Sequence, residues 1–155
     1  CKNLSDPYRN AIGIFMRQIL NNESLTIYGN GKQTRAFTHI DSIKSTIAAC
    51  IENPKSKNEV YNLGSDTSNS INELAQILLS ISDSSSKTLN LESRNEVIDA
   101  ISTHEKAENH FGKYTEVSLN AALKTVWEWA KNTELKQAKR FKNIEIQKRL
   151  PENWK

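Results

Sequence analysis

The chain has 155 residues, of which 37% are hydrophobic and 25% charged, and its formal net charge is +3 at pH 7. This is the composition of a soluble globular domain that is long enough to bury a core. No apolar run approaches the roughly 20 residues that a bilayer requires, so we expect no membrane segment.

The first predicted element is an amphipathic helix, which follows the turn signal at residues 5–7. Its apolar residues at helical spacing are Ile12, Phe15, Met16, Ile19 and Leu20. A strand over residues 25–28, a Gly-Asn-Gly turn and a second strand over residues 36–40 come next. Two strands joined by such a turn predict a β-hairpin.

A second helix is predicted to begin at the capping residue Asp41 and to end at Asn53, directly before Pro54. The residues expected on its inward face are Ile43, Ile47, Ala48 and Ile51. A short strand is predicted over residues 60–64. A capping box at residues 70–73 then opens a helix with inward residues Ile71, Leu74, Leu78 and Ile81.

The second half of the chain predicts a strand over residues 88–91, a short helix over 105–110 that stops at Gly112, and a helix capped by Ser118. The apolar residues of this last helix are Leu119, Ala122, Leu123, Val126, Trp127 and Ala130. The elements together predict an α/β fold, with α+β order within this chain.

The end of the chain is basic: residues 134–155 hold seven Lys or Arg residues against three Glu. We predict two parts, a domain over residues 1–133 and a basic tail over residues 134–155 that packs back on it. The tail residues expected to make this contact are Ile144, Ile146, Leu150 and Trp154. Because the rest of the chain is close to neutral, we expect no nucleic-acid binding, and the basic segment is a solvated or partner-facing surface.

The pair Tyr28 and Lys32 has the Tyr-x-x-x-Lys spacing that marks a catalytic pair in some oxidoreductases. A Lys lowers the pKa of such a Tyr from one turn away on a helix, whereas this pair is separated by a glycine turn. Gly29 and Gly31 lack a third glycine at position 34, and they lead into a strand. We therefore predict no dinucleotide fingerprint, no P-loop and no catalytic residue in this chain.

Histidine and cysteine residues give no sign of a metal or nucleophilic site. His39, His104 and His110 do not have metal-ligand spacing, and each is expected to be a surface or partly buried polar residue. Cys1 and Cys50 are too few for a disulfide framework, which favours a reducing cytoplasm. We also expect the chain to be a fragment, because it begins with neither Met nor an obvious first element.

Two arginines follow predicted strands at loop positions, and a planar guanidinium there could bind a diphosphate bidentately. Arg35 comes just after the glycine turn, and Arg94 follows the strand over residues 88–91. A surface ion pair is the alternative reading of each arginine, and both readings stay open. The helix start near Asn10, with its unpaired N–H groups, is a third possible anion contact.

The order and spacing of these motifs resemble the C-terminal half of the extended short-chain dehydrogenase/reductase family. These proteins are NAD-dependent nucleotide-sugar epimerases and dehydratases, and the resemblance is closest to the UDP-glucose 4-epimerase-like members. It runs across nearly the whole chain, through residues 6–10, 25–41, 61–64, 94–97, 102–107 and 111–112.

The resemblance implies a set of substrate-binding residues: Asn10, Thr26, Tyr28, Arg35, Phe37 and Arg94. Backbone groups near Thr26 and Tyr28 would read the edge of a uracil. The two arginines would neutralise the diphosphate, the helix start would add N–H donors, and the phenylalanine ring would line the pocket. The sequence departs from the family at Ala36, Ser42 and Thr103, where Asp is common.

The family's glycine-rich NAD loop and its helical Tyr-x-x-x-Lys pair precede the region that this chain resembles. We therefore expect the C-terminal, substrate-binding part of an extended short-chain dehydrogenase/reductase. Only the last pieces of the Rossmann domain, near residues 41–64, are expected here, and its N-terminal core is expected to be absent. NAD would then be bound by the missing N-terminal part, and this chain alone would be inactive.

The implied function is the nucleotide-sugar-binding portion of an NAD-dependent UDP-sugar epimerase, an isomerase of carbohydrate metabolism that works through a 4-keto intermediate. The expected partners are a UDP-sugar such as UDP-glucose and a second copy, as a homodimer or through self-association. The same portion of a nucleotide-sugar dehydratase or UDP-glucuronate decarboxylase is an alternative. A non-catalytic binding module, or a tail that binds an acidic partner, is another.

Overall fold

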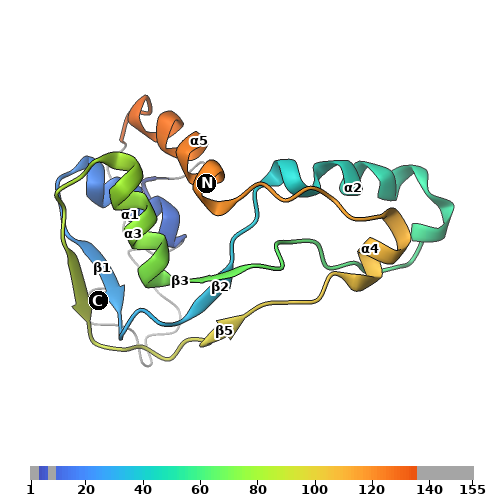
Figure 1. Cartoon of the computed structure of the whole chain (residues 1–155), viewed down its shortest axis with the longest axis horizontal. Helices are drawn as coiled ribbons and strands as arrows, with labels where there is room; N and C mark the ends of the chain where they lie inside the picture. Colours follow the sequence, from blue (N-terminus) through green and yellow to red (C-terminus); the bar gives the residue numbers. More distant parts are fainter. Residues whose placement is uncertain (1–3, 7–9, 136–155) are drawn as a thin grey trace, which may run out of the picture.

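The structure is a computed structural model, and it describes residues 4–6 and 10–135. The predicted packing of the basic tail lies outside these residues, apart from the first two residues of the tail. The described part is elongated: α1, α3, α5 and β1 gather at one end, and α2 and α4 lie at the other (Figure 1).

The hydrophobic core lies at the first of these ends, among α1 (Ala11–Leu20), β1 (Leu25–Tyr28), α3 (Ile71–Ser82) and α5 (Leu119–Lys131). Its largest fully buried side chains are Met16, Leu25, Ile27, Leu74, Leu78 and Leu123. The helical periods that predicted these three helices are confirmed, because the buried residues of each helix are spaced three and four apart and lie on one face, which packs into the core.

The five strands in the described part of the chain form two small sheets. In one, β1 pairs in parallel with β4 (Thr88–Leu91). In the other, β2 (Thr34–Ala36) lies between β3 (Ser68–Ser70), which is antiparallel to it, and β5 (Asp99–Ala100), which is parallel to it. The predicted hairpin is therefore wrong, since β1 and β2 belong to different sheets.

The glycine turn between β1 and β2 explains why no hairpin forms. Gly31 has a φ of 71°, and its carbonyl accepts a 3.0 Å hydrogen bond from the Asn72 backbone N–H at the start of α3. The Asn72 side-chain Nδ2 also donates to the Asn30 carbonyl at 2.9 Å. A Cβ at Gly31 would lie 2.0 Å from Asn72 Oδ1, so any other residue would displace the Asn72 side chain and would have to adopt a positive φ. The turn is thus held against α3 and leads the chain into the second sheet.

The helix α2 (Ile40–Glu52) turns a different face inward from the one that its sequence predicts. Its buried residues are Ser42 and Thr46, whereas Ile47 and Ile51 are 44% and 86% exposed. The Ser42 hydroxyl accepts a 2.9 Å hydrogen bond from the Val117 backbone N–H, which draws the polar side of the helix toward the segment before α5. The predicted apolar inward face is wrong for this reason.

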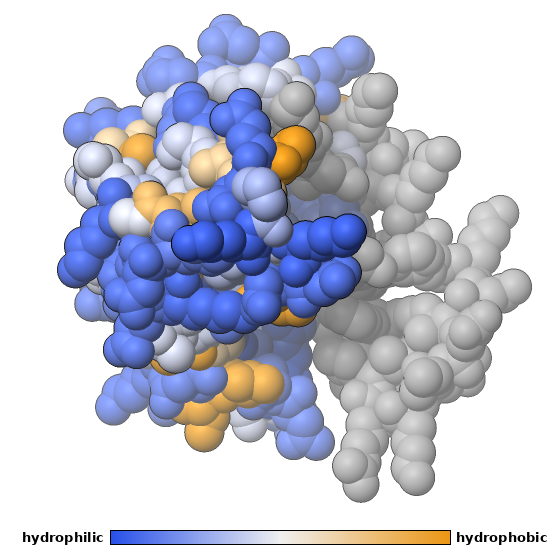
Figure 2. Space-filling model, turned by 90° about the vertical axis from the view of Figure 1, so that its right-hand side faces the viewer, coloured by the Kyte–Doolittle hydropathy of each residue, from blue (hydrophilic) through white to orange (hydrophobic). Residues whose placement is uncertain are grey.

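The start of α2 and the segment after it also differ from expectation. His39, and not Asp41, is the N-cap, because its Nδ1 accepts from the Asp41 N–H at 3.3 Å. After the short helix η1 (Pro54–Ser56), the predicted strand over residues 60–64 is absent from the described structure, and Val60 is 78% exposed. Figure 2 faces this end and shows separate hydrophobic patches on a largely hydrophilic surface.

The last predicted helices are confirmed in place and in their end signals. α4 (Glu105–Phe111) stops at Gly112, which has a φ of 82°. The Ser118 hydroxyl caps α5 by accepting from the Ala121 N–H at 3.3 Å. Within the described residues, no helix is both long and apolar enough to cross a membrane.

The capping box at the start of α3 gives a stability prediction. The Ser70 hydroxyl accepts from the Glu73 N–H at 3.1 Å, and Glu73 Oε2 accepts from the Ser70 N–H at 2.7 Å. We expect Ser70→Ala to lower the free energy of unfolding by about 1 kcal/mol, because an N–H at the helix start loses its acceptor. Urea unfolding monitored by circular dichroism measures this change.

The matched control is Ser80→Ala, because Ser80 is an exposed serine farther along the same helix. It should leave stability unchanged or slightly raised. The hydrogen bond from the Ser70 N–H, and then that from its hydroxyl, lowers the pKa of Glu73. The contribution of the Glu73 carboxylate to the box is therefore present above the ordinary carboxyl pKa and is lost as the pH falls through the lowered one. Equal unfolding midpoints for both variants would contradict the role of the cap.

Candidate functional site

Five side chains from separate parts of the chain form a cluster where the two sheets meet. Tyr28 ends β1, Gln33 directly precedes β2, and Arg35 is the middle residue of β2. Arg94 and Glu96 lie in the loop between β4 and β5. Because β4 pairs with β1 and β5 pairs with β2, this loop must pass from one sheet to the other. It thereby carries its two charged residues to the residues of the first turn. We call these five residues the arginine cluster.

The centre of the arginine cluster is the Glu96 carboxylate. Its Oε2 lies 3.3 Å from Arg35 Nη2, and its Oε1 lies 3.7 Å from Arg94 Nε. The Gln33 side-chain Nε2 donates to the same Oε1 at 3.1 Å. Both arginines selected from the sequence therefore face one anionic group.

Further contacts hold the two guanidinium groups in place. Arg35 Nη1 donates to the Thr34 carbonyl at 2.7 Å and to the Ile98 carbonyl at 3.2 Å. The Arg94 guanidinium lies 4.1 Å from the centroid of the Tyr28 ring, a cation–π contact. The arginine side chains remain 26% and 35% exposed, so both cations are fixed and accessible from solvent.

The other residues implied by the resemblance, Thr26, Asn10 and Phe37, lie outside the arginine cluster and make other contacts. Gln18 engages Thr26 twice: its Oε1 accepts from the Thr26 N–H at 3.2 Å, and its Nε2 donates to the Thr26 hydroxyl at 2.9 Å. Asn10 precedes α1 with a φ of 68°, and Phe37 packs, partly buried, against the hydrophobic core. The substrate roles of these three residues stay predictions.

Neither Gln33 nor Glu96 is among the site residues that the sequence predicts. A signal for Glu96 was present, because it lies two residues after Arg94 in the same loop. That spacing alone does not indicate that Arg35, which is 61 residues away, meets the same carboxylate. Predicting this contact requires knowing that β5 pairs with β2, because that pairing brings the loop between β4 and β5 to Arg35.

A second polar cluster surrounds His104, which is 3% exposed. Its Nδ1 lies 2.6 Å from Asp66 Oδ1, and its Nε2 lies 3.1 Å from the Ser102 hydroxyl. A Cβ at Gly64 would lie 3.0 Å from the same Nε2, and the Tyr114 hydroxyl binds the backbone of Gly64. Both ring nitrogens are thus engaged, and the cluster ties the start of α4 to residues 64–66.

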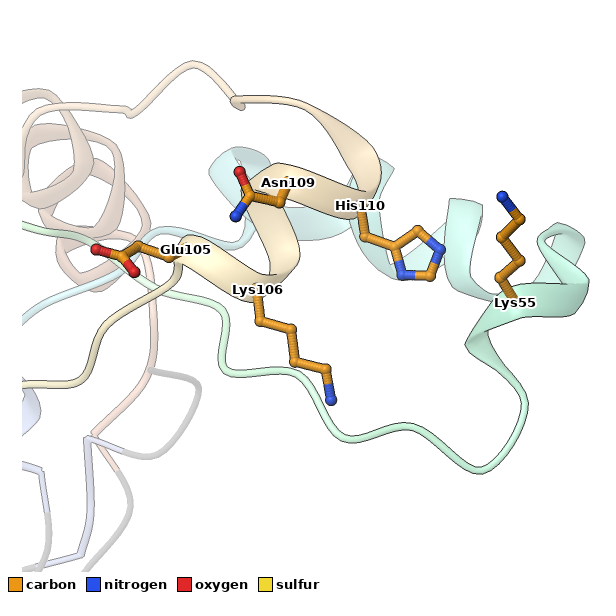
Figure 3. Close-up of a pocket in the computed structure, with 5 residues that line it drawn as sticks. All are labelled: Lys55, Glu105, Lys106, Asn109 and His110. Carbon is orange, nitrogen blue, oxygen red and sulfur yellow. The ribbon is translucent and has the colours of Figure 1, made fainter.

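A hollow of about 550 Å³ lies between α4 and η1, and it is lined by Lys55, Glu105, Lys106, Asn109 and His110. In Figure 3, His110 points toward Lys55, whereas Glu105 points away from both. Lys106 Nζ donates to Glu59 Oε2 at 2.7 Å and lies 5.0 Å from the Tyr61 ring centroid. The charge of this lysine is therefore already matched within the chain.

Metal-ligand side chains do not gather anywhere in residues 4–6 and 10–135. In that part of the chain, no group of three or more His, Cys, Asp or Glu residues could hold a metal ion.

Comparison with known proteins finds a family match over the first part of the chain. Residues 3–64 match the NAD dependent epimerase/dehydratase family. The chain is 42% identical to a UDP-N-acetyl-alpha-D-glucosaminuronate decarboxylase of Bacillus cytotoxicus over 55% of this chain and 26% of that protein. It is 30% identical to a putative UDP-glucose 4-epimerase of Methanocaldococcus jannaschii over 78% of this chain and 39% of that protein.

The fold is similar to that of a solved UDP-glucuronic acid 4-epimerase from Bacillus cereus, whose structure contains UDP-glucuronic acid and NAD. The TM-score is 0.73 at 30% identity, and the similarity covers 81% of this chain and 40% of that one. The chain thus spans well under half the length of these relatives.

The family match corrects our fold prediction, which placed only the last Rossmann pieces near residues 41–64 and the N-terminal core outside the chain. The match begins at residue 3, so an N-terminal Rossmann portion is assigned to this chain, and the chain has part of the α/β fold of the short-chain dehydrogenases/reductases. The prediction was wrong because the missing Gly-x-x-Gly-x-x-Gly pattern tests one phosphate-binding loop. It does not test the strands and helices around that loop.

The Lys106–Glu59 contact predicts how Glu59 responds when its partner is removed. The hydrogen bond from Lys106, and then its charge, lower the pKa of Glu59. We expect Lys106→Met to raise the Glu59 pKa back toward its ordinary value, because both causes are removed. Carboxyl-carbon NMR titration measures the change.

Lys113→Met is the control, because Lys113 Nζ lies 3.9 Å from Glu108 and does not engage Glu59. In the unchanged protein the pairing stabilises the fold above the ordinary Glu59 pKa, and this contribution is lost as the pH falls through the lowered one. An identical Glu59 titration in wild type and Lys106→Met would refute the assignment.

Proposed function

We propose that this chain, which is homologous to proteins of the NAD-dependent epimerase/dehydratase family, binds the diphosphate of a UDP-sugar through Arg35 and Arg94. The observation that supports this proposal is the convergence of the two guanidinium groups on one carboxylate. An anion is therefore stable at the point where they meet. The UDP-glucuronic acid in the solved relative from Bacillus cereus has a diphosphate of the required kind.

The chemistry of the arginine cluster suits a diphosphate better than a single carboxylate. Guanidinium groups bind phosphate oxygens through parallel N–H donors, and a diphosphate can offer separate oxygens to each arginine. Hydrogen bonds to charged groups contribute roughly 1.5–3 kcal/mol each. The backbone contacts of Arg35 and the ring contact of Arg94 reduce the conformational entropy lost on binding.

The uridine would lie on the side of β1 that is turned away from the core. Leu25 and Ile27 of this strand are buried, while Thr26 and Tyr28 alternate with them and are half-buried. Binding at this edge would leave the sugar beyond the diphosphate, held at a fixed distance from the base. The contribution of this chain to a reaction is then positioning, which fixes the sugar for groups supplied elsewhere.

The residues of the glycine turn do not fit an NAD diphosphate. The Asn72 side chain fills the space at Gly31, where a Cβ would lie 2.0 Å from Asn72 Oδ1. Tyr28 and Lys32 are separated by this turn and do not share a helix. We therefore derive no reaction step through NAD in this chain, and we propose that other parts of the whole protein bind it.

For the whole protein we propose a UDP-sugar 4-epimerase, an isomerase that acts through a 4-keto sugar. The closely similar decarboxylase from Bacillus cytotoxicus supports a UDP-sugar decarboxylase as the second candidate, because the same arginine pair suits both substrates. Analysis of the sugar product distinguishes them, since only decarboxylation releases carbon dioxide. A nucleotide-sugar binder without catalysis would bind UDP and form neither product.

The proposal predicts that Arg35→Ala weakens UDP binding by about 10- to 150-fold, which corresponds to the loss of one charged hydrogen-bond partner. Isothermal titration calorimetry with UDP measures the affinity. Lys44→Ala on α2 removes the same charge from an exposed side chain and should leave the affinity unchanged. Equal affinities for wild type and Arg35→Ala would rule out the diphosphate site.

We also propose that the chain self-associates through the exposed apolar side of α2. Ile47 and Ile51 are 44% and 86% exposed, and a second copy can cover such side chains. Ile51→Lys should then lower the molar mass measured by light scattering at high concentration. Ser45→Lys adds the same charge at an exposed polar position of that helix and should leave the mass unchanged. A monomeric wild type would contradict the proposal.

A further inference from the structure

We propose that Glu96 is an internal anion that occupies the diphosphate position of the arginine cluster and must be displaced when the ligand binds. It would thereby set the affinity of the site. This inference rests on the proposed function, since it assigns a competitor to the same two arginines. It makes Glu96 an affinity-determining residue and gives it no part in the chemical step.

The contacts of Glu96 are those that a bound anion would make. Its two carboxylate oxygens are divided between the arginines, with Oε2 at 3.3 Å from Arg35 Nη2 and Oε1 at 3.7 Å from Arg94 Nε. An acceptor oxygen of a diphosphate at either position would meet the same donor. A single N–H cannot make a well-aligned hydrogen bond to a Glu96 oxygen and to a diphosphate oxygen at the same time. The carboxylate and the diphosphate therefore compete for the arginine donors.

The charge of the arginine cluster favours exchange. Two guanidinium groups face one carboxylate, which leaves one positive charge without a matching anion in the arginine cluster. A diphosphate carries more negative charge than the carboxylate and can satisfy both cations. The Glu96 side chain is 24% exposed, so a displaced carboxylate can be solvated. These conditions allow displacement at a modest cost.

Gln33 supports the exchange. Its Nε2 donates to Glu96 Oε1 at 3.1 Å and to the Tyr28 carbonyl at 3.1 Å. The second bond holds the amide in place when the carboxylate leaves, because it does not depend on Glu96. The freed N–H then points to the position that Glu96 Oε1 had occupied, where it can donate to the incoming anion.

The loop that carries Glu96 permits this change without disturbing the core. Residues 92–98 lie between β4 and β5 in neither helix nor strand, and Val97 and Ile98 are 63% and 71% exposed. The Ile98 carbonyl accepts from the Thr34 N–H at 2.8 Å, which anchors the loop to β2 beyond Glu96. Rotation of the Glu96 side chain therefore suffices, and the strand pairing is kept.

The test is Glu96→Gln, which keeps the size and shape of the side chain and removes its charge. We expect UDP to bind about three- to tenfold more tightly, as estimated from two partly exposed ion pairs that no longer compete. Glu92→Gln is the matched control, because it removes the same charge from an exposed position of the same loop. Its UDP affinity should equal that of wild type. Isothermal titration calorimetry is repeated with inorganic pyrophosphate, which lacks the uridine.

The outcomes separate this inference from the proposed function. Displacement is supported if Glu96→Gln binds both UDP and pyrophosphate more tightly than wild type and Glu92→Gln does not. Tighter pyrophosphate binding without UDP binding supports displacement and overturns the proposed function. Weaker or unchanged pyrophosphate binding by Glu96→Gln overturns displacement, because Glu96 then orients the arginines or does not affect them. An equal gain in Glu92→Gln also overturns it, because the effect would then be one of net charge.

Discussion

The parallel pairing of β1 with β4 is the interaction on which both the core and the arginine cluster depend. It buries Leu25 and Ile27 beneath α1 and α3, and it sets Tyr28 opposite Leu91. The loop that leaves β4 at Leu91 therefore begins beside Tyr28, and Arg94 packs on that ring. A slip of one residue in this register would exchange the buried and outward side chains of β1 and would also move the loop.

The two ends of the molecule are stabilised in different ways. The end that contains α1, α3 and α5 buries large apolar side chains from each helix. The end that contains α2 and α4 depends on polar ties, among them His104 with Asp66 and Lys106 with Glu59. The Lys106–Glu59 pair is exposed and contributes little by itself, whereas His104 is buried with both ring nitrogens engaged. The arginine cluster lies between the two ends, on strands anchored to the core.

Exposure of the apolar side of α2 has a local cause. Ser42 and Thr46 of α2 are buried, and Ser42 contacts the segment before α5. The apolar side of the helix cannot face that segment at the same time as the side that carries Ser42. Once the Ser42 hydroxyl accepts from Val117, Ile47 and Ile51 must point elsewhere. The same bond gives the buried Ser42 hydroxyl a donor from the segment before α5.

The sequence by itself determined the elements whose signals are local. Helical periodicity identified α1, α3 and α5, the capping box located the start of α3, and Gly112 located the end of α4. Only the tertiary structure decided which strands pair, which face of α2 is buried, and that Glu96 lies between Arg35 and Arg94. The physical reason is separation along the chain. Caps and helical faces arise from residues three or four positions apart, whereas the arginine cluster joins residues more than sixty positions apart through strand pairs that no local pattern encodes.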